Sequence, residues 1–348
     1  MTRRWLWVAG AVAVALVASA GAVAAVVRRP PPPEQVVTRY LELLRARDAE
    51  AARAYLAVVP DLAGASDDLL VAEAMTGDWR VTQVVRRYHE SDDPAIVDVT
   101  LTAADGTAGQ GRFQLLRDGR SWTIQNPVVR VDRSWLPLTY TDFNGVVSDA
   151  AAVWLFPGTY RPYLGASGLV GLDVPTYVAL PRPDARSDDG MRTQAYLPRL
   201  GLTDRFHDEL HRQLDAWIKD CAARAEPYPA GCPFAAGNPG KREISVGRDD
   251  YSADEDTTVT WEVVESPQVR LQQANAAFTV QVVRPGRLHL SGTAVPLGGD
   301  QPEPFEGDCG VWLPGLRVTL GPTGEFTFHP SPWAGEFACT YRGLAGEI

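Results

Sequence analysis

The sequence predicts an α+β protein that is held to a membrane by an N-terminal helix. Three observations support this fold class. An uncharged apolar run near the N-terminus is long enough to cross a bilayer. Two later stretches carry apolar side chains at helical spacing, and most of the other apolar stretches alternate with polar residues, as strands do. The composition, with 45% hydrophobic and 22% charged residues, is that of a folded chain and excludes a disordered one.

Residues 1–29 are expected to form a transmembrane anchor with flanking arginines. Residues 5–27 contain no charged side chain and would form a helix of roughly 34 Å, longer than the ~30 Å hydrocarbon core of a bilayer. Two alternatives remain open at this point. Ala18-Ser19-Ala20 resembles a signal-peptidase site, and Arg3-Arg4 resembles the start of a twin-arginine signal.

The expected topology is a single pass through the plasma membrane, with a cytoplasmic N-terminus and residues 30–348 outside the cytoplasm. Arg3 and Arg4 favour this orientation, whereas Arg28 and Arg29 oppose it. The four cysteines decide the question, because an even number confined to the C-terminal half is typical of an oxidising compartment. Without these four arginines, 29 of the 33 basic residues remain against 43 acidic ones, which excludes nucleic acid as an expected partner.

A first domain is expected over residues 34–132, after a stiff polyproline linker at residues 30–33. Its first helix begins at Glu34 and carries apolar residues at steps of three and four: Val36, Val37, Tyr40, Leu41 and Leu44. Asp48 is a suitable N-cap for a second helix over AEAARAYLAV. Four strand-like runs follow, and Asp-Gly pairs between them are typical of hairpin turns.

The stretch PPEQVVTRYLELLRARDAEAARAYL, followed by four strands with the RDGRSWTIQ hairpin, resembles a known family. It is similar to the membrane-proximal nuclear transport factor two-like domain of actinobacterial single-pass envelope proteins. The resemblance implies a cone-shaped curved sheet that wraps on helices and encloses a cavity. Catalytic members of that fold carry acidic and tyrosine side chains inside the cone. No such set can be matched to this sequence, so the resemblance assigns no catalytic residue.

Residues 133–200 are expected to form a small β-rich segment, because Asn144-Gly145 and a turn at residues 157–160 bracket a strand-like AAAVWLF. Residues 201–348 are expected to form a C-terminal domain of one helix and an antiparallel sheet. Thr203 is predicted to cap this helix, whose apolar stripe contains Phe206, Leu210, Leu214, Trp217, Ile218 and Cys221. Farther along, Pro285-Gly286 is predicted to be the turn between two strands.

Two segments in these regions are also similar to segments of other cell-envelope proteins. NGVVSDAAAVWLFPGTY is similar to small β-domains that follow nuclear transport factor two-like domains. KDCAARAEPYPAGCPF resembles stretches found in actinobacterial envelope proteins. Both resemblances imply a cellular context and no activity.

The cysteines predict two disulfides, Cys221–Cys232 and Cys309–Cys339, which is one of three connectivities for four cysteines. Cys221 ends the helical stripe, and proline and glycine residues can turn the chain back to Cys232. Cys309 and Cys339 flank the strand-like GLRVTL and EFTFH, so their bond would join the ends of a hairpin. Four free thiols and a zinc site of four cysteines are the alternatives, and the cysteine spacing disfavours zinc.

No catalytic residue, cofactor or metal site is predicted. His207 and His211 have the spacing of a zinc pair on a helix, yet Asp208 stands where a zinc protease carries its glutamate. An acidic cluster at residues 249–256 lacks the glycine and glutamate positions of a calcium-binding loop. Neither lysine follows a serine by three residues, so a serine-x-x-lysine acyl-transfer site is absent.

The expected function is therefore that of a non-catalytic, membrane-anchored interaction or ligand-binding protein of the cell envelope. Its partner would be an envelope protein or a small ligand, with the membrane contacted through residues 5–27. One alternative is an enzyme that acts in the cavity of the 34–132 cone. Another is a carbohydrate- or peptidoglycan-binding protein that uses exposed tryptophans such as Trp154, Trp312 or Trp333, whereas Trp79 and Trp122 fit core positions.

Overall fold

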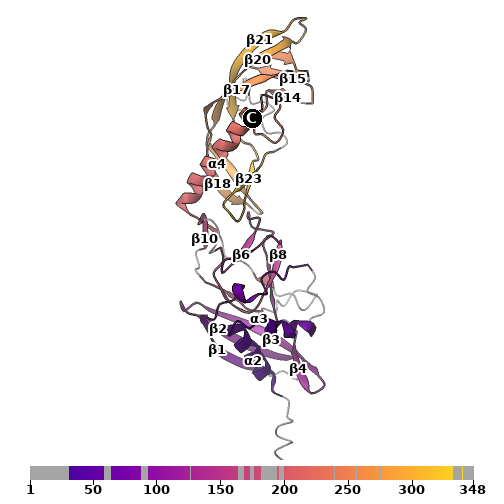
Figure 1. The fold of residues 1–348 in the computed structure, drawn as a ribbon, viewed down its shortest axis with the longest axis vertical. Coiled ribbons are helices and arrows are strands. Elements are labelled where there is room, and N and C mark those ends of the chain that lie inside the picture. Colours follow the sequence, from indigo (N-terminus) through magenta and orange to yellow (C-terminus); the bar gives the residue numbers. More distant parts are fainter. Residues whose placement is uncertain are drawn as a thin grey trace, which may run out of the picture.

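A computed structural model describes residues 31–58, 64–87, 93–125, 127–163, 168–172, 176–181, 194–195, 200–238, 240–254, 257–274, 276–331 and 339. The fold of this part is α+β and consists mainly of curled antiparallel sheets with a few helices. The elements are arranged along one long axis, with the strands of residues 79–124 at the lower end and the elements after residue 203 at the upper end (Figure 1). Within these ranges no helix is long and apolar enough to span a membrane, and the expected anchor of residues 1–29 lies outside them.

The first two helices follow the predicted pattern with small differences. Helix α2 (Pro33–Arg45) begins one residue before Glu34, because a proline in the first turn needs no partner for its missing N–H. Its buried side contains Val37, Tyr40, Leu41 and Leu44. Asp48 caps the next helix by accepting a hydrogen bond from the N–H of Ala51 at 3.0 Å. The predicted second helix is short, since α3 (Ala49–Arg53) continues as the 3-10 helix η1 (Ala54–Val58).

The four predicted strands form one antiparallel sheet in sequence order, here called the first sheet: β1 (Trp79–Arg87), β2 (Ala95–Ala103), β3 (Ala108–Asp118) and β4 (Ser121–Ile124). Gly106 and Gly119 have positive φ angles in the hairpin turns, as the Asp-Gly pairs predict. Strand β2 alternates between buried and half-buried residues, so one side of the sheet, the inner face, packs against α2. The opposite side is called the outer face.

Residues 129–202, here called the middle segment, form short strands in small sheets: β5 (Val129–Asp132), β6 (Thr141–Phe143), β7 (Val146–Ser148), β8 (Ala152–Leu155), β9 (Gly158–Tyr160), β10 (Val170–Leu172), β11 (Tyr177–Ala179), β12 (Gln194–Ala195) and β13 (Leu200–Leu202). Asn144 and Gly145 both have positive φ angles in the β6–β7 turn. The predicted turn at residues 157–160 is wrong, because residues 158–160 pair with β11 as a strand. Strand β5 pairs with β8, and the core of the middle segment continues into the elements after residue 203.

The long helix α4 (Asp204–Ala222) buries the predicted stripe. Its Trp217 is half-buried and stacks on Phe328, with ring centres 4.8 Å apart. Thr203 occupies the N-cap position, but the predicted cap is wrong. Its hydroxyl instead donates to the carbonyl oxygens of Gly168 and Leu169, at 3.1 and 3.0 Å, and so fastens the helix start to the middle segment.

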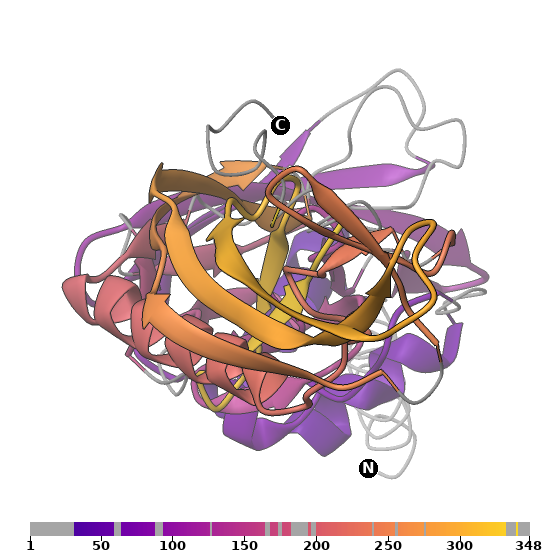
Figure 2. The ribbon, with the colours of Figure 1, turned by 90° about the horizontal axis from the view of Figure 1, so that it is seen from above.

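Among the described residues after α4 the structure has these strands: β14 (Gly237–Asn238), β15 (Glu243–Val246), β16 (Asp249–Ser252), β17 (Val259–Glu265), β18 (Gln268–Ala274), β19 (Ala277–Arg284), β20 (Gly286–Pro296), β21 (Glu303–Val311), β22 (Arg317–Leu320) and β23 (Phe326–His329). Strands β14, β15, β16, β20, β17 and β21 form one sheet, and β18, β19, β22 and β23 form another. Viewed from above, these strands curl around a common centre with α4 along one side (Figure 2).

The connection at Pro285-Gly286 differs from the predicted turn. Strand β17 pairs antiparallel with β20 in one sheet, and β18 pairs antiparallel with β19 in the other. The chain therefore passes from one sheet to the other at Pro267 on one strand and at Pro285 on the other. The result is a single long hairpin that bends in its middle, because proline cannot donate to the ladder at the bend.

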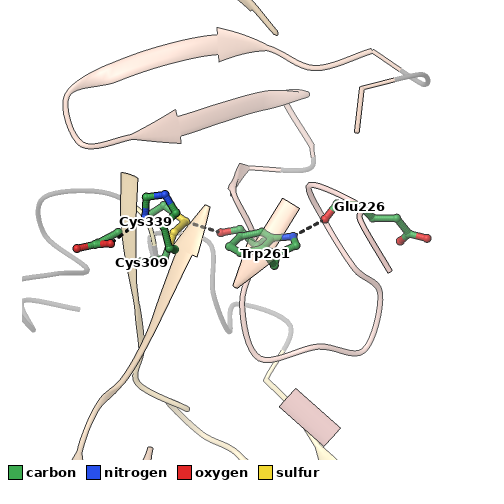
Figure 3. Close-up of a disulfide and its surroundings, with 7 residues drawn as sticks. Glu226, Trp261, Cys309 and Cys339 are labelled. Carbon is green, nitrogen blue, oxygen red and sulfur yellow. Dashed lines mark hydrogen bonds and ion pairs between the residues drawn. A yellow bond between two sulfur atoms is a disulfide. The ribbon is translucent and has the colours of Figure 1, made fainter. Parts of the chain in front are cut away.

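The cysteines form the two disulfides expected from the sequence, Cys221–Cys232 and Cys309–Cys339. The first joins the end of α4 to the following loop. The second joins β21 to the chain after β23, and the carbonyl of Cys339 accepts a hydrogen bond from the N–H of Gly247 at 2.9 Å. The Cys309–Cys339 disulfide lies beside Trp261, whose indole N–H donates to the carbonyl oxygen of Glu226 at 2.9 Å (Figure 3).

Candidate functional site

The inner face of the first sheet is filled by apolar and aromatic side chains. Tyr40 from α2 is fully buried against Phe113 and Tyr55, with ring centres 6.3 and 4.7 Å away. Its hydroxyl donates to the carbonyl oxygen of Pro127 at 2.5 Å. Burial raises the pKa of Tyr40 well above its ordinary value, and nearby tyrosines add to this effect. The hydroxyl therefore stays protonated and acts as a structural donor.

The middle segment contributes to this filling. Leu180, 3% exposed, belongs to the same apolar cluster as Tyr40, and Val178 packs beside it. Two glycines of β3 allow this close approach: a Cβ on Gly109 would lie 2.6 Å from Val178, and a Cβ on Gly111 would lie 2.5 Å from Leu180. The next carbonyl, of Pro181, accepts a hydrogen bond from the N–H of Arg112 at 2.7 Å. Residues 178–181 thus close the inner face on the side of β3.

The outer face carries the best-formed polar group of the first sheet. Asp98 of β2 accepts hydrogen bonds from the Nε atoms of two arginines, Arg87 of β1 and Arg112 of β3, the latter at 2.8 Å. Burial alone would raise the pKa of Asp98, but the hydrogen bonds and charges of Arg112 and Arg87 outweigh it and hold this pKa below its ordinary value. The carboxylate therefore stays charged and fixes both guanidinium groups.

These three residues line a pocket of about 520 Å³, here called the outer pocket. Its remaining lining consists of uncharged residues of β1–β3 and of the segment that closes the inner face: Gln83, Val85, Val99, Thr100, Gln110, Gly111 and Pro181. The hydroxyl of Thr100 donates to the side-chain oxygen of Gln83 at 3.4 Å. Val85, 45% exposed, adds an apolar surface. The outer pocket therefore combines two fixed cations, one anion, amides and a small apolar patch.

A second polar group lies buried in the middle segment. Asp142 is fully buried and accepts a hydrogen bond from the N–H of Gly145 at 2.9 Å. The rings of Tyr140 and Tyr163 meet edge to face at 6.0 Å, and neither buried hydroxyl has a hydrogen-bond partner among the described residues. Burial is the main cause that raises the pKa of both tyrosines. We call these three residues, with Arg133, the buried polar centre.

Arg133 closes the buried polar centre on one side. Its guanidinium donates to three backbone carbonyls, those of Ala150, Leu138 and Asp149, at 3.0, 2.7 and 2.5 Å. Burial lowers the pKa of Arg133, while the negative charge of neighbouring groups opposes this shift. Tyr163 also has a φ angle of 59°, which is strained for a bulky residue. The centre thus brings two tyrosines, a carboxylate and a guanidinium within electrostatic reach of one another.

The histidines singled out in the sequence serve packing. The Nδ1 of His211 lies 2.8 Å from the carbonyl oxygen of His207, and its Nε2 accepts the N–H of Val269 at 3.3 Å. Both ring nitrogens of His211 therefore contact backbone groups, Nδ1 within α4 and Nε2 in β18. Across the part of the chain that the structure describes, no group of three or more histidine, cysteine, aspartate or glutamate side chains is arranged to hold a metal ion.

The acidic cluster lies only partly within the described ranges. Residues 249–252 form strand β16, where Asp250 accepts a hydrogen bond from Ser245, while residues 255 and 256 lie outside the described ranges.

Among the tryptophans, Trp79 and Trp154 are buried, 5% and 6% exposed. Trp122, expected in the core, is half-buried, and the Cζ atoms of Arg86 and Arg117 lie 6.0 and 5.8 Å from the centre of its ring. Trp333 lies outside the described ranges.

Sequence reasoning missed both polar groups described above. Arg87, Asp98 and Arg112 stand on three strands, and only the strand register places them side by side. The available signal was the alternation of β2, which assigns Asp98 to the side opposite Val97 and Val99.

No protein-family model, curated protein or solved structure matches the chain.

Proposed function

We propose that this chain is a non-catalytic binding protein of the cell envelope, held at the membrane by residues 5–27, with residues 30–348 outside the cytoplasm. Its first domain, residues 34–132, has in this proposal a nuclear transport factor two-like fold. One observation carries the proposal: apolar side chains fill the inner face of the first sheet, whereas fixed polar groups line a pocket on its outer face. Recognition at the surface therefore has more support than chemistry in a cavity.

The two disulfides support the extracytoplasmic placement. Disulfides persist in oxidising compartments and are rare where thiols are kept reduced. All four cysteines take part in them. The first sheet follows the expected anchor closely in the chain, since α2 begins at Pro33. In this proposal the outer pocket is held near the membrane surface, and the elements after residue 203 extend away from it.

The two alternatives have less support. An enzyme in the cone would need ionisable groups on the inner face, where the described side chains are mainly apolar and Tyr40 is held as a structural donor. A sugar-binding protein would need exposed aromatic rings, yet of its three candidate tryptophans Trp154 is buried, Trp312 is half-buried and Trp333 lies outside the described ranges. The described residues that line the outer pocket include no aromatic side chain.

The test is capture of the full-length protein from native membranes after mild cross-linking. We expect a stoichiometric envelope partner or a retained small ligand, and we expect Arg87→Gln with Arg112→Gln to abolish its recovery. Arg80→Gln is the matched control, because it removes the same charge from an exposed position of β1 that does not line the outer pocket. Recovery of no partner, together with turnover of an envelope metabolite by the purified protein, would defeat the proposal.

A further inference from the structure

His211 of α4 lies between two backbone groups that fix the position of its ring proton. Its Nδ1 is 2.8 Å from the carbonyl oxygen of His207, one turn earlier in the helix, and its Nε2 is 3.3 Å from the backbone nitrogen of Val269. A carbonyl oxygen can only accept a hydrogen bond, and a backbone N–H can only donate one. In this arrangement the ring of His211 is therefore neutral, with its proton on Nδ1 and a lone pair on Nε2.

The bond from Val269 to His211 covers the edge of a sheet. Among the described strands, β18 stands at the end of the order β18-β19-β22-β23 and pairs with β19 on one side. Helix α4 is in contact with β18, and His211 gives the N–H of Val269 its acceptor. Val269 is 3% exposed, so water has little access to replace the imidazole. A buried N–H that loses its acceptor carries a desolvation cost.

Two other contacts hold α4 in place without depending on pH near neutrality. The side-chain amide of Gln213 binds backbone groups of the β22–β23 turn at 2.8 Å, and an amide does not titrate. Asp215 accepts a hydrogen bond from Ser266 in the connection between β17 and β18. Hydrogen bonds from Lys219 and Ser266 hold the pKa of Asp215 below its ordinary value, so this contact persists in mild acid.

The ionisable side chains around His211 belong to α4 and to the elements that contact it. Among the described residues they are His207, Asp208, Glu209, Arg212 and Asp215 on α4, Glu262 and Glu265 on β17, Arg270 on β18, Arg284 on β19, Glu325 on the β22–β23 turn and His329 on β23. Three of these carboxylates, those of Glu209, Asp215 and Glu265, are held in ion pairs. Carboxylates ordinarily keep their charge above about pH 5, so histidines are the groups that change charge between about pH 8 and 5.

From these observations we infer that α4 and β18 are joined by an acid-sensitive contact, in which a proton taken up by His211 breaks its bond to Val269 and frees the edge of β18. The proton comes from the solvent and binds Nε2, the atom that accepts the N–H of Val269. Two donors then face each other, and the N–H of Val269 has lost its acceptor. Gln213 and Asp215 keep the helix attached, so the opening is local. This inference goes beyond the proposed binding function and does not depend on it.

The test is amide hydrogen exchange of the full-length, detergent-solubilised protein at pH 7.5 and pH 5.0, read by NMR with labelled valine and histidine. The protection factor removes the pH dependence of chemical exchange itself, and Val269→Ile assigns the signal of Val269. We expect the protection factor of Val269 to fall at least about tenfold in acid. The nitrogen shifts of His211 should show the Nδ1–H tautomer at pH 7.5 and a doubly protonated ring at pH 5.0.

Variants assign the effect to one ring. His211→Gln keeps a side-chain carbonyl that can accept from Val269 and that does not titrate, so the protection factor of Val269 should stay within about threefold between the two pH values. His207→Gln and His329→Gln are the matched controls and should keep the acid effect. His207 contributes only its backbone carbonyl to this contact, and the Nε2 of His329 lies 3.2 Å from the hydroxyl of Thr319, which can donate or accept.

Four results would each overturn the inference. They are a proton on Nε2 of His211 at pH 7.5, equal protection of Val269 at the two pH values, an acid effect in His211→Gln as large as in the wild type, and loss of protection throughout the protein at pH 5.0. All but the third are read from the wild type alone and so do not depend on the folding of any variant. The fourth would show global unfolding in place of a local opening.

Discussion

Pro267 and Gly286 lie in contact where the long hairpin bends between its two sheets: a Cβ on Gly286 would lie 2.7 Å from the Cδ of Pro267. Glu265 and Arg284 form an ion pair at 2.9 Å across the same bend. The bend carries β17 into β18 and β19 into β20, and so joins the two sheets after α4 into one body. A glycine is required here because the two strands cross closer than any side chain allows.

Gly286→Ala is therefore expected to destabilise the protein. The added methyl would also lie 2.9 Å from the backbone nitrogen of Pro267 and 3.0 Å from the carbonyl oxygen of Glu265, neither of which can move independently of the bend. We expect a loss of about 1–3 kcal/mol in the free energy of unfolding, measured by urea denaturation. Gly158→Ala is the control, because its Cβ would meet its nearest neighbour at 3.6 Å. An unchanged midpoint for Gly286→Ala would show that the bend is loose.

The bend is also a feature that local sequence could not predict. Helix α2, the strands of the first sheet and the apolar stripe of α4 follow from local periodicity, and the Asp-Gly turns from the glycine requirement of tight hairpins. Pro285-Gly286 has the composition of a turn as well. Only partners distant in the chain decide that it is a bend within a longer strand pair.

The candidate site was missed for the same physical reason. Alternation along β2 places Asp98 on one face, but the arginines reach it from neighbouring strands whose register is not written in local sequence. Thr203 failed as a cap because Gly168 and Leu169, more than 30 residues away, offer carbonyl acceptors to its hydroxyl. The Cys221–Cys232 pairing could be predicted because the helix end, the turn residues and the short separation all lie within local sequence.

Leu180→Ala tests whether the middle segment closes the inner face of the first sheet. Leu180 is 3% exposed and lies against Gly111 in the apolar cluster around Tyr40. Removing three carbons from this site should cost about 2–5 kcal/mol in the free energy of unfolding. Leu116→Ala, at a 41% exposed position of β3, should stay within about 0.5 kcal/mol. Equal losses in the two variants would place residue 180 outside the core.

Glu209 gives a prediction for acid. Hydrogen bonds from Arg212 and Gln213 lower the pKa of Glu209 to about 2. Its pKa in the unfolded chain is about 4.3, so the stability that this carboxylate adds is present above pH ~4.3 and is lost as the pH falls through about 2. Carboxyl-carbon NMR should find a midpoint near 2 in the wild type and a higher one in Arg212→Gln. Lys219→Gln, which removes the same charge beside Asp215, should leave that midpoint unchanged.

The disulfides predict a defined peptide map. Proteolysis of the oxidised full-length protein without reduction should release one peptide that joins Cys221 to Cys232 and another that joins Cys309 to Cys339. Replacing the first pair by serine should cost about 3 kcal/mol in the free energy of unfolding, according to the chain-entropy estimate for a loop of this size. A peptide that joins Cys221 to Cys309, or four thiols open to alkylation, would contradict both the pairing and the extracytoplasmic placement.

Tyr163→Phe tests the buried polar centre against a matched tyrosine. The hydroxyl of Tyr163 is buried beside Tyr140 without a hydrogen-bond partner in the described part of the chain, whereas the hydroxyl of Tyr160 donates to the carbonyl oxygen of Phe156 at 2.7 Å. A buried donor without a partner carries a desolvation cost, so its removal should raise the free energy of unfolding by about 1 kcal/mol. Tyr160→Phe should lower it by about 1 kcal/mol, because a made hydrogen bond is lost. Both values come from urea denaturation at pH 7, where burial keeps the two phenols protonated. If Tyr163→Phe instead destabilises the protein as much as Tyr160→Phe, the hydroxyl of Tyr163 has a partner in solution, and the centre binds water or another small polar group.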